Sequence, residues 1–153
     1  RKITYNIALI KHGLVDKLTL GNLEAQRDWG YAEDYVEAMW LMLQQETPKD
    51  YVIATGKTFS VKEFVKRAFE HAGLNYKDHV QTSEKYLRPS DVELLLGDPS
   101  KAIKDLGWTP SKTSLDDLIK MMVESDMKLV EAQKSSVNIY KESDIKLYEH
   151  FKE

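Results

Sequence analysis

Residues 20–38 read Leu-Gly-Asn-Leu-Glu-Ala-Gln-Arg-Asp-Trp-Gly-Tyr-Ala-Glu-Asp-Tyr-Val-Glu-Ala, and this stretch decides the fold that the sequence predicts. A short apolar strand ends at Leu20 and runs into a Gly-Asn turn. Arg27 follows in a loop, and an apolar helix begins a few residues later. In α/β proteins this succession places a positive charge at a sheet edge, where ligand phosphates bind. The stretch therefore predicts an α/β fold with an anion site near Arg27.

The sequence on either side of this stretch alternates between helix and strand patterns. Residues 51–55 are a continuous apolar run before Gly56, which predicts a buried, parallel strand. Ser60 and Glu63 have the spacing of a capping box, so a helix should begin there and end near Gly73. Three further elements are expected: a helix over residues 3–11 closed by Gly13, a strand over residues 17–20, and a helix over residues 31–45 that is apolar enough to be buried on more than one side.

The second half of the chain predicts shorter elements followed by a long helix. Weak strand character lies around Val80, and Pro89 should keep the Tyr86–Pro89 segment extended. A short apolar piece, Leu94–Leu96, precedes Asp98 and Pro99, which should start a helix over residues 100–106. Ser114 should cap the next helix, whose inner face would carry Leu115, Leu118, Ile119, Met122, Val123 and Met127. We predict a main unit over residues 1–131 and a tail over residues 132–153 that is helical near residues 145–151 or mobile.

Composition excludes several classes of protein. The chain has 153 residues, a formal net charge of −3 and a pI near 5.9, which argues against nucleic-acid binding by bulk electrostatics. It contains no cysteine, so thiolate catalysis and Cys-ligated zinc are absent. No apolar run approaches the roughly 18 residues of a membrane span, and a cytoplasmic location is expected. The four histidines lack ligand spacing, and the three tryptophans (Trp29, Trp40 and Trp108) are expected to pack in cores or hinges.

A few polar residues could bind an anionic ligand. Arg27 and Arg88 each lie in a loop beside a structured element, where a planar, bidentate guanidinium suits a diphosphate; the alternative is a surface salt bridge. Asp91 could accept hydrogen bonds from ribose hydroxyls or could cap a turn. Asn22 could bond a base or phosphate or could simply form a turn, and Lys2 could meet an anion at a helix N-terminus or remain solvated.

The usual catalytic and cofactor motifs are missing. The sequence holds no Gly-x-Gly-x-x-Gly or Gly-x-x-Gly-x-x-Gly turn and no Walker A motif. It has no Tyr-x-x-x-Lys pair where a strand–helix core could hold one. The chain therefore has no convincing set of general acids and bases of its own.

Several strings closely resemble the GDP-mannose 4,6-dehydratase family of extended short-chain dehydrogenases. They are Gly21–Gly30, Asp34–Gln44, Tyr51–Gly56, Arg88–Glu93, and Leu96–Ala102 with Leu106-Gly-Trp108, and the resemblance runs from Arg1 to about Val130. It implies a Rossmann-type fold with a smaller sugar-nucleotide-binding part. It also implies a lyase that uses NADP to convert GDP-mannose to GDP-4-keto-6-deoxymannose, the precursor of GDP-fucose.

The resemblance assigns the candidate residues to one substrate site. Arg27 and Arg88 would hold the diphosphate, and Asp91 would hold the ribose, although the family often has the longer Glu at that position. Tyr86 counts among the substrate-binding residues. Lys2, Gly21 and Asn22 would lie in the guanosine pocket.

The family's glycine-rich turn and catalytic residues precede the segment that begins here at Arg1. We therefore expect this chain to be the C-terminal, substrate-binding part of such an enzyme, inactive alone, with the NADP-binding half elsewhere and homo-oligomers in the complete protein. Its first helix and its 51–55 strand should then lack packing neighbours. The alternatives are part of another nucleotide-sugar epimerase or reductase, or a non-catalytic nucleotide-binding or scaffold chain.

Overall fold

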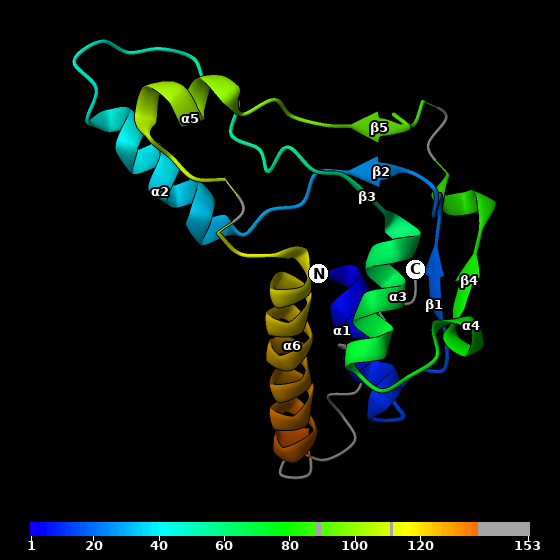
Figure 1. Cartoon of the computed structure of the whole chain (residues 1–153). Helices are drawn as coiled ribbons and strands as arrows, with labels where there is room; N and C mark the ends of the chain where they lie inside the picture. Colours follow the sequence, from blue (N-terminus) through cyan, green and yellow to red (C-terminus); the bar gives the residue numbers. More distant parts are fainter. Residues whose placement is uncertain (88–89, 111, 138–153) are drawn as a thin grey trace.

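The computed structural model describes residues 1–87, 90–110 and 112–137. Many more of these residues lie in helices than in strands (Figure 1). Arg88 and the predicted helix at residues 145–151 lie outside the described residues. The elements follow in the order α1 (Lys2–Lys11), β1 (Leu18–Leu20), β2 (Gln26–Arg27), α2 (Ala32–Leu43), β3 (Phe59–Ser60), α3 (Val61–His71), α4 (Tyr76–His79), β4 (Val80–Thr82), η1 (Glu84–Tyr86), β5 (Leu94–Leu95), α5 (Ser100–Leu106) and α6 (Leu115–Val137).

Two small sheets carry the strands. β1 pairs in parallel with β4, with Leu18 opposite Val80, so the strands predicted at these two places are confirmed. The other sheet has the order β3-β2-β5, in which β2 is antiparallel to β3 and parallel to β5. Because β2 is central, Arg27 at its end has a neighbour on each side: Phe59 in β3 and Leu95 in β5.

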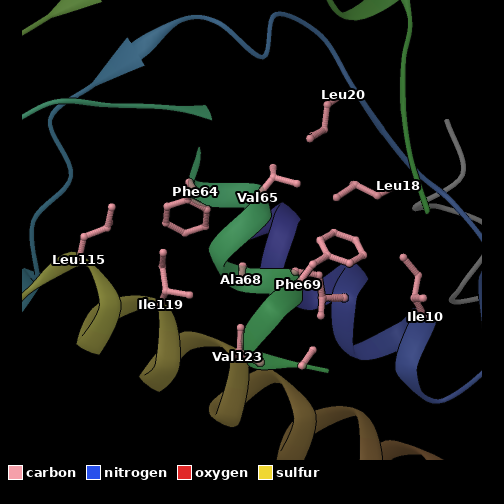
Figure 2. Close-up of a cluster of buried hydrophobic side chains, with 12 residues drawn as sticks. Ile10, Leu18, Leu20, Phe64, Val65, Ala68, Phe69, Leu115, Ile119 and Val123 are labelled. Carbon is pink, nitrogen blue, oxygen red and sulfur yellow. The ribbon is translucent and has the colours of Figure 1, made fainter. Parts of the chain in front are cut away.

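The main hydrophobic core lies among α1, α3, α6 and β1 (Figure 2). The Ser60 hydroxyl accepts a hydrogen bond from the Glu63 backbone N–H at 3.1 Å, which caps α3 as the capping-box spacing predicted. Ser114 caps α6 in the same way, through the Asp117 N–H at 3.1 Å. The apolar faces of these helices then meet β1 in a cluster that includes Ile7, Leu18, Phe64, Val65, Ala68, Phe69, Ile119 and Val123.

The expectation that α1 lacks neighbours is wrong. Ile7 and Ala8 have no exposed surface, because α1 lies against both α6 and α3. Thr4 is also fully buried and donates a hydrogen bond to the Asp126 carboxylate of α6 at 2.7 Å. The helix is therefore completed by elements of this chain that follow it in sequence.

A second, smaller core joins α2 to α5, away from the main one (Figure 1). Trp108 is 1% exposed, and its indole N–H donates to the Asp34 carbonyl oxygen at 2.9 Å. The Asp34 carboxylate in turn accepts from the Thr113 N–H at 3.0 Å, which ties α2 to the segment that leads into α6. Trp29 packs on Phe64, so the packing role predicted for Trp29 and Trp108 is confirmed.

The strand predicted over residues 51–55 is wrong. This segment belongs to neither of the two sheets, and instead Tyr51 and Ile53 pack against the α2–α5 core. A short apolar run can be buried by side-chain packing as well as by a strand ladder, and the sequence pattern does not distinguish the two. Gly97 lies directly against Ala54, with no room for a side chain between them.

Burial of α2 on more than one side is also wrong. Ala38 faces the small core and is fully buried, yet Met39, Trp40 and Leu43 are 54%, 60% and 82% exposed. No element within the described ranges covers this face, so the packing role predicted for Trp40 fails as well.

Candidate functional site

Three of the predicted site residues meet at the end of β2. Arg27 donates from one guanidinium nitrogen to Asp91 Oδ1 at 2.7 Å, and Asn22 Nδ2 donates to Asp91 Oδ2 at 3.3 Å. The Arg27 and Asp91 side chains are only 23% and 21% exposed. Residues more than 60 positions apart therefore form one hydrogen-bonded cluster, the Arg27 cluster, made of Asn22, Arg27 and Asp91.

The backbone also orients the Arg27 guanidinium. Its second terminal nitrogen donates to the carbonyl oxygens of Val92 at 2.6 Å and Gln26 at 2.8 Å. The parallel pairing of β2 with β5 brings these carbonyls together. Since arginine keeps its charge at all physiological pH values, the cluster holds a permanent, oriented fork of donors.

Lys2, Gly21 and Tyr86 form a second contact group beside the first. The Lys2 ammonium lies 4.1 Å from the centre of the Tyr86 ring, a cation–π geometry. Gly21 lies so close to the Tyr86 backbone that an added Cβ would be 2.8 Å from its carbonyl carbon. Gly21 therefore stands where only glycine fits. The peptide bond between Gly21 and Asn22 joins this group to the Arg27 cluster.

A hollow of about 420 Å³ borders the cluster on the side of Asn22. Its walls come from the β1–β2 loop, from β2 and from the start of β5: Asn22, Glu24, Ala25, Gln26, Glu93 and Leu94. All the predicted site residues that the structure describes thus lie in two adjoining groups. Arg88 lies outside the described residues, so its predicted place beside Arg27 stays a prediction.

Sequence reasoning missed Asp28, which follows Arg27 directly. One Asp28 oxygen accepts from the Thr55 N–H at 2.9 Å and from the Thr55 hydroxyl at 2.5 Å, and the other accepts from the Gly56 N–H at 3.0 Å. Gly56 has φ +73°, as a tight turn requires. The only signal in the sequence is that Asp28 belongs to the same Arg-Asp-Trp-Gly string as Arg27.

Tyr35, in α2, has a shifted pKa. Burial raises the pKa of the Tyr35 phenol above its ordinary value, and the carboxylates of Asp28 and Asp34 raise it further. The ring packs against Gly30, where an added Cβ would lie 2.6 Å from a ring carbon. Tyr35 therefore stays neutral near pH 7 and acts as packing for the loop after Arg27.

Metal ligation finds no support in the described ranges, where no group of three or more His, Asp or Glu side chains could hold an ion. None of the helices described there is both long enough and apolar enough to cross a membrane.

Comparison with known proteins places this chain in a family. The family model described as GDP-mannose 4,6 dehydratase matches residues 1–122. The chain belongs to the GDP-mannose 4,6-dehydratase family. GDP-mannose 4,6 dehydratase 1 of Arabidopsis thaliana is 54% identical over 134 residues, which cover 88% of this chain and 37% of that relative. The human GDP-mannose 4,6 dehydratase is 44% identical, with 85% of this chain and 39% of the relative covered. This member of the GDP-mannose 4,6-dehydratase family thus spans well under half the length of these relatives.

Solved structures agree with the fold. RMD from Pseudomonas aeruginosa, complexed with NADPH, matches with a TM-score of 0.74 at 16% identity, covering 83% of this chain and 41% of that one. A UDP-glucose 4-epimerase with UDP-glucose from Thermotoga maritima matches with a TM-score of 0.69 at 26% identity, covering 84% and 40%. The predicted family and the predicted fold, part of an extended short-chain dehydrogenase of Rossmann type, are both confirmed for this GDP-mannose 4,6-dehydratase relative.

Proposed function

We propose that this chain forms the sugar-nucleotide-binding part of a GDP-mannose 4,6-dehydratase, a lyase that converts GDP-mannose to GDP-4-keto-6-deoxymannose. The observation that carries the proposal is the meeting of Asn22, Arg27 and Asp91 in one partly buried cluster, in a chain of this family. A fixed guanidinium is a good ligand for a diphosphate because it is planar, permanently charged and able to donate two parallel hydrogen bonds.

The two contact groups bind different parts of the substrate. Arg27, together with Arg88, binds the diphosphate, and Asp91 accepts from the ribose while it holds Arg27. Lys2, Gly21 and Tyr86 lie beside the guanosine, where the Tyr86 ring offers a flat surface and Lys2 a positive charge. The chain's role in the reaction is to bind and orient the substrate.

NADP, which the family implies, would supply the hydride acceptor and donor of the reaction. The residues of this chain do not fit its usual cradle, because the sequence lacks the glycine-rich turn. Within the described ranges the glycines with positive φ are Gly13, Gly56, Gly73 and Gly107, and none stands between a parallel strand and a following helix. We therefore assign no cofactor contact to this chain and derive no step through NADP.

A related epimerase or reductase acting on another nucleotide sugar is the main competing function, and the structural likeness to UDP-glucose 4-epimerases gives it some weight. The curated relatives at 43–54% identity favour the dehydratase. Thermal-shift measurements on the protein with GDP-mannose, UDP-glucose and dTDP-glucose separate the two functions. We expect stabilisation by GDP-mannose, whereas a preference for a uridine or thymidine ligand would reject the dehydratase.

The variant Arg27→Ala tests the diphosphate contact. Loss of a charge-assisted hydrogen bond costs about 1.5–3 kcal/mol, so GDP should bind roughly 10- to 150-fold more weakly. Arg67→Ala is the matched control, because Arg67 is also an arginine held by carboxylates, those of Glu63 and Asp116, but belongs to neither contact group of the proposed site. Isothermal titration with GDP should show the loss in Arg27→Ala alone. Equal affinity in wild type and Arg27→Ala would refute the diphosphate assignment.

A further inference from the structure

Asp28 connects the end of β2 to a turn that lies 27 residues further along the chain. Its two carboxylate oxygens accept three hydrogen bonds: from the Thr55 N–H, the Thr55 hydroxyl and the Gly56 N–H. Thr55 is 9% exposed and Asp28 is half-buried, so the two bonds to Thr55 are partly shielded from solvent, whereas Gly56 is exposed. A charged acceptor with several backbone donors makes a strong and directional connection.

The connection lies at the end of a very short strand. β2 has only two residues, Gln26 and Arg27, and so short a strand fixes its own backbone poorly. Ladder pairing holds the backbone at Arg27 from both sides, through Phe59 in β3 and Leu95 in β5. Beyond Arg27 the ladder ends, and the Asp28 carboxylate replaces it as the next point of attachment.

The place of the Arg27 guanidinium depends on that backbone. Its bonds to Asp91 Oδ1 at 2.7 Å and to the Val92 carbonyl at 2.6 Å need the end of β2 to stay in register with the start of β5. We propose that Asp28 is a positioning residue: by fixing the backbone after Arg27 to the Thr55–Gly56 turn, it holds the Arg27 guanidinium in the orientation that binds a nucleoside diphosphate. The claim that Arg27 in this orientation binds a nucleoside diphosphate rests on the proposed function.

A double-mutant cycle tests whether Asp28 acts through Arg27. Asp28→Asn keeps the shape and one acceptor oxygen, but it sets an amide where the carboxylate accepted from a backbone N–H. We expect GDP to bind about tenfold more weakly to Asp28→Asn, and we expect no further loss when Asp28→Asn is added to Arg27→Ala. A residue with a merely structural role would lower the affinity by the same factor in both backgrounds, and that result would overturn the proposal.

The matched control is Asp34→Asn. The Asp34 carboxylate also accepts from a threonine N–H and hydroxyl, those of Thr113, but on α2 rather than beside β2. The variant Asp34→Asn should lower the melting temperature of the protein without changing its affinity for GDP. If Asp28→Asn does not fold, Thr55→Val removes one of the three donors to Asp28, together with the hydroxyl's bonds to the Lys57 backbone, and should give a smaller loss of GDP affinity that again requires Arg27.

A ligand-free measurement separates failure of this inference from failure of the proposed function. The Nε–Hε signal of Arg27 in a nitrogen–proton NMR spectrum reports the guanidinium environment. It should move or broaden in Asp28→Asn and stay in place in Asp34→Asn. If the signal moves while wild type binds no GDP, the positioning role stands and the proposed function fails. If the signal does not move, Asp28 does not position Arg27.

Discussion

Four consecutive residues after the start of β2 each contact a different segment of the chain. Arg27 bonds Asp91, Asp28 bonds the Thr55–Gly56 turn, Trp29 packs on Phe64 with ring centres 5.0 Å apart, and Gly30 lies against Tyr35. One short string therefore joins Arg27 and its carboxylate partner to the main core and to the α2–α5 core. This explains in physical terms why the string Arg-Asp-Trp-Gly carries so much information about the fold.

Gly21→Ala should damage the site through a backbone collision. The new Cβ would meet the carbonyl group of Tyr86, which cannot rotate away as a side chain can. Overpacking of this kind costs about 1–3 kcal/mol, so we expect a lower urea midpoint and weaker GDP binding. Gly30→Ala is the control, because its Cβ would meet the outer end of the Tyr35 side chain, which can move. An equal or larger loss in Gly30→Ala would contradict the explanation.

Asp98 gives a pH-dependent prediction at the start of α5. Hydrogen bonds from the Ser100 hydroxyl at 2.5 Å, and then from the Ser100 N–H at 2.9 Å, hold the pKa of Asp98 below its ordinary value. Because the folded pKa is the lower one, this stabilisation is present above the ordinary pKa and is lost as the pH falls through the folded pKa. Ser100→Ala should raise the pKa of Asp98, seen by NMR titration of its carboxyl carbon. Ser100→Thr keeps the hydroxyl and should change the pKa little.

For single residues, the sequence predicted which of them would lie close together but not which partners would fix them in place. Lys2, Gly21, Asn22, Arg27, Tyr86 and Asp91 were all named from motifs, and they lie in two adjoining groups. Asp28 was missed because its partners lie 27 positions away, and nothing in local spacing pairs a loop carboxylate with a distant turn. Residue type predicts chemistry, whereas the choice of partner comes from the folded chain.

Among the elements, helix ends were predicted best because their signals are local. The Ser60 cap of α3 is an example: Ser60→Ala removes the acceptor for the Glu63 N–H and should cost about 1 kcal/mol of unfolding free energy. Chemical denaturation measures this loss, and Ser60→Asp, which keeps an acceptor, should restore most of it. No loss in Ser60→Ala would mean that the hydroxyl contributes nothing to the stability of α3.

Strand predictions depended on partners that the sequence does not show. The short apolar piece at residues 18–20 and the weak strand signal around Val80 became β1 and β4 because the two segments pair with each other. The more apolar run at residues 51–55 did not become a strand, since its side chains pack against the α2–α5 core instead. Hydrophobic pattern thus did not identify the strands by itself: Val80 in β4 is only half-buried and Val52 in the unpaired run is exposed, and pairing decided which segments became strands.

At the scale of the whole molecule, one apolar face of α2 has no covering element among the described residues. The outer stripe of α2 exposes Val36, Met39, Trp40 and Leu43, spaced as one side of a helix. Exposed apolar stripes of this kind mark surfaces that another structure covers. The chain also covers only 37–41% of the curated relatives, which contain much further sequence. We therefore expect this stripe to be covered where such a chain is part of a longer protein of this family.

Tryptophan fluorescence tests that expectation. Of the three tryptophans, Trp108 is 1% exposed and Trp40 is 60% exposed, so acrylamide should quench Trp40 most readily in the 153-residue chain. Trp40→Phe should remove the readily quenched emission, whereas Trp108→Phe, the control, should leave it. In a longer protein that contains this chain, Trp40 should become shielded because apolar side chains cover the α2 stripe. Equal quenching of Trp40 in the two proteins would show that the stripe stays in water, and the reason for its apolar character would then have to lie in a separate partner.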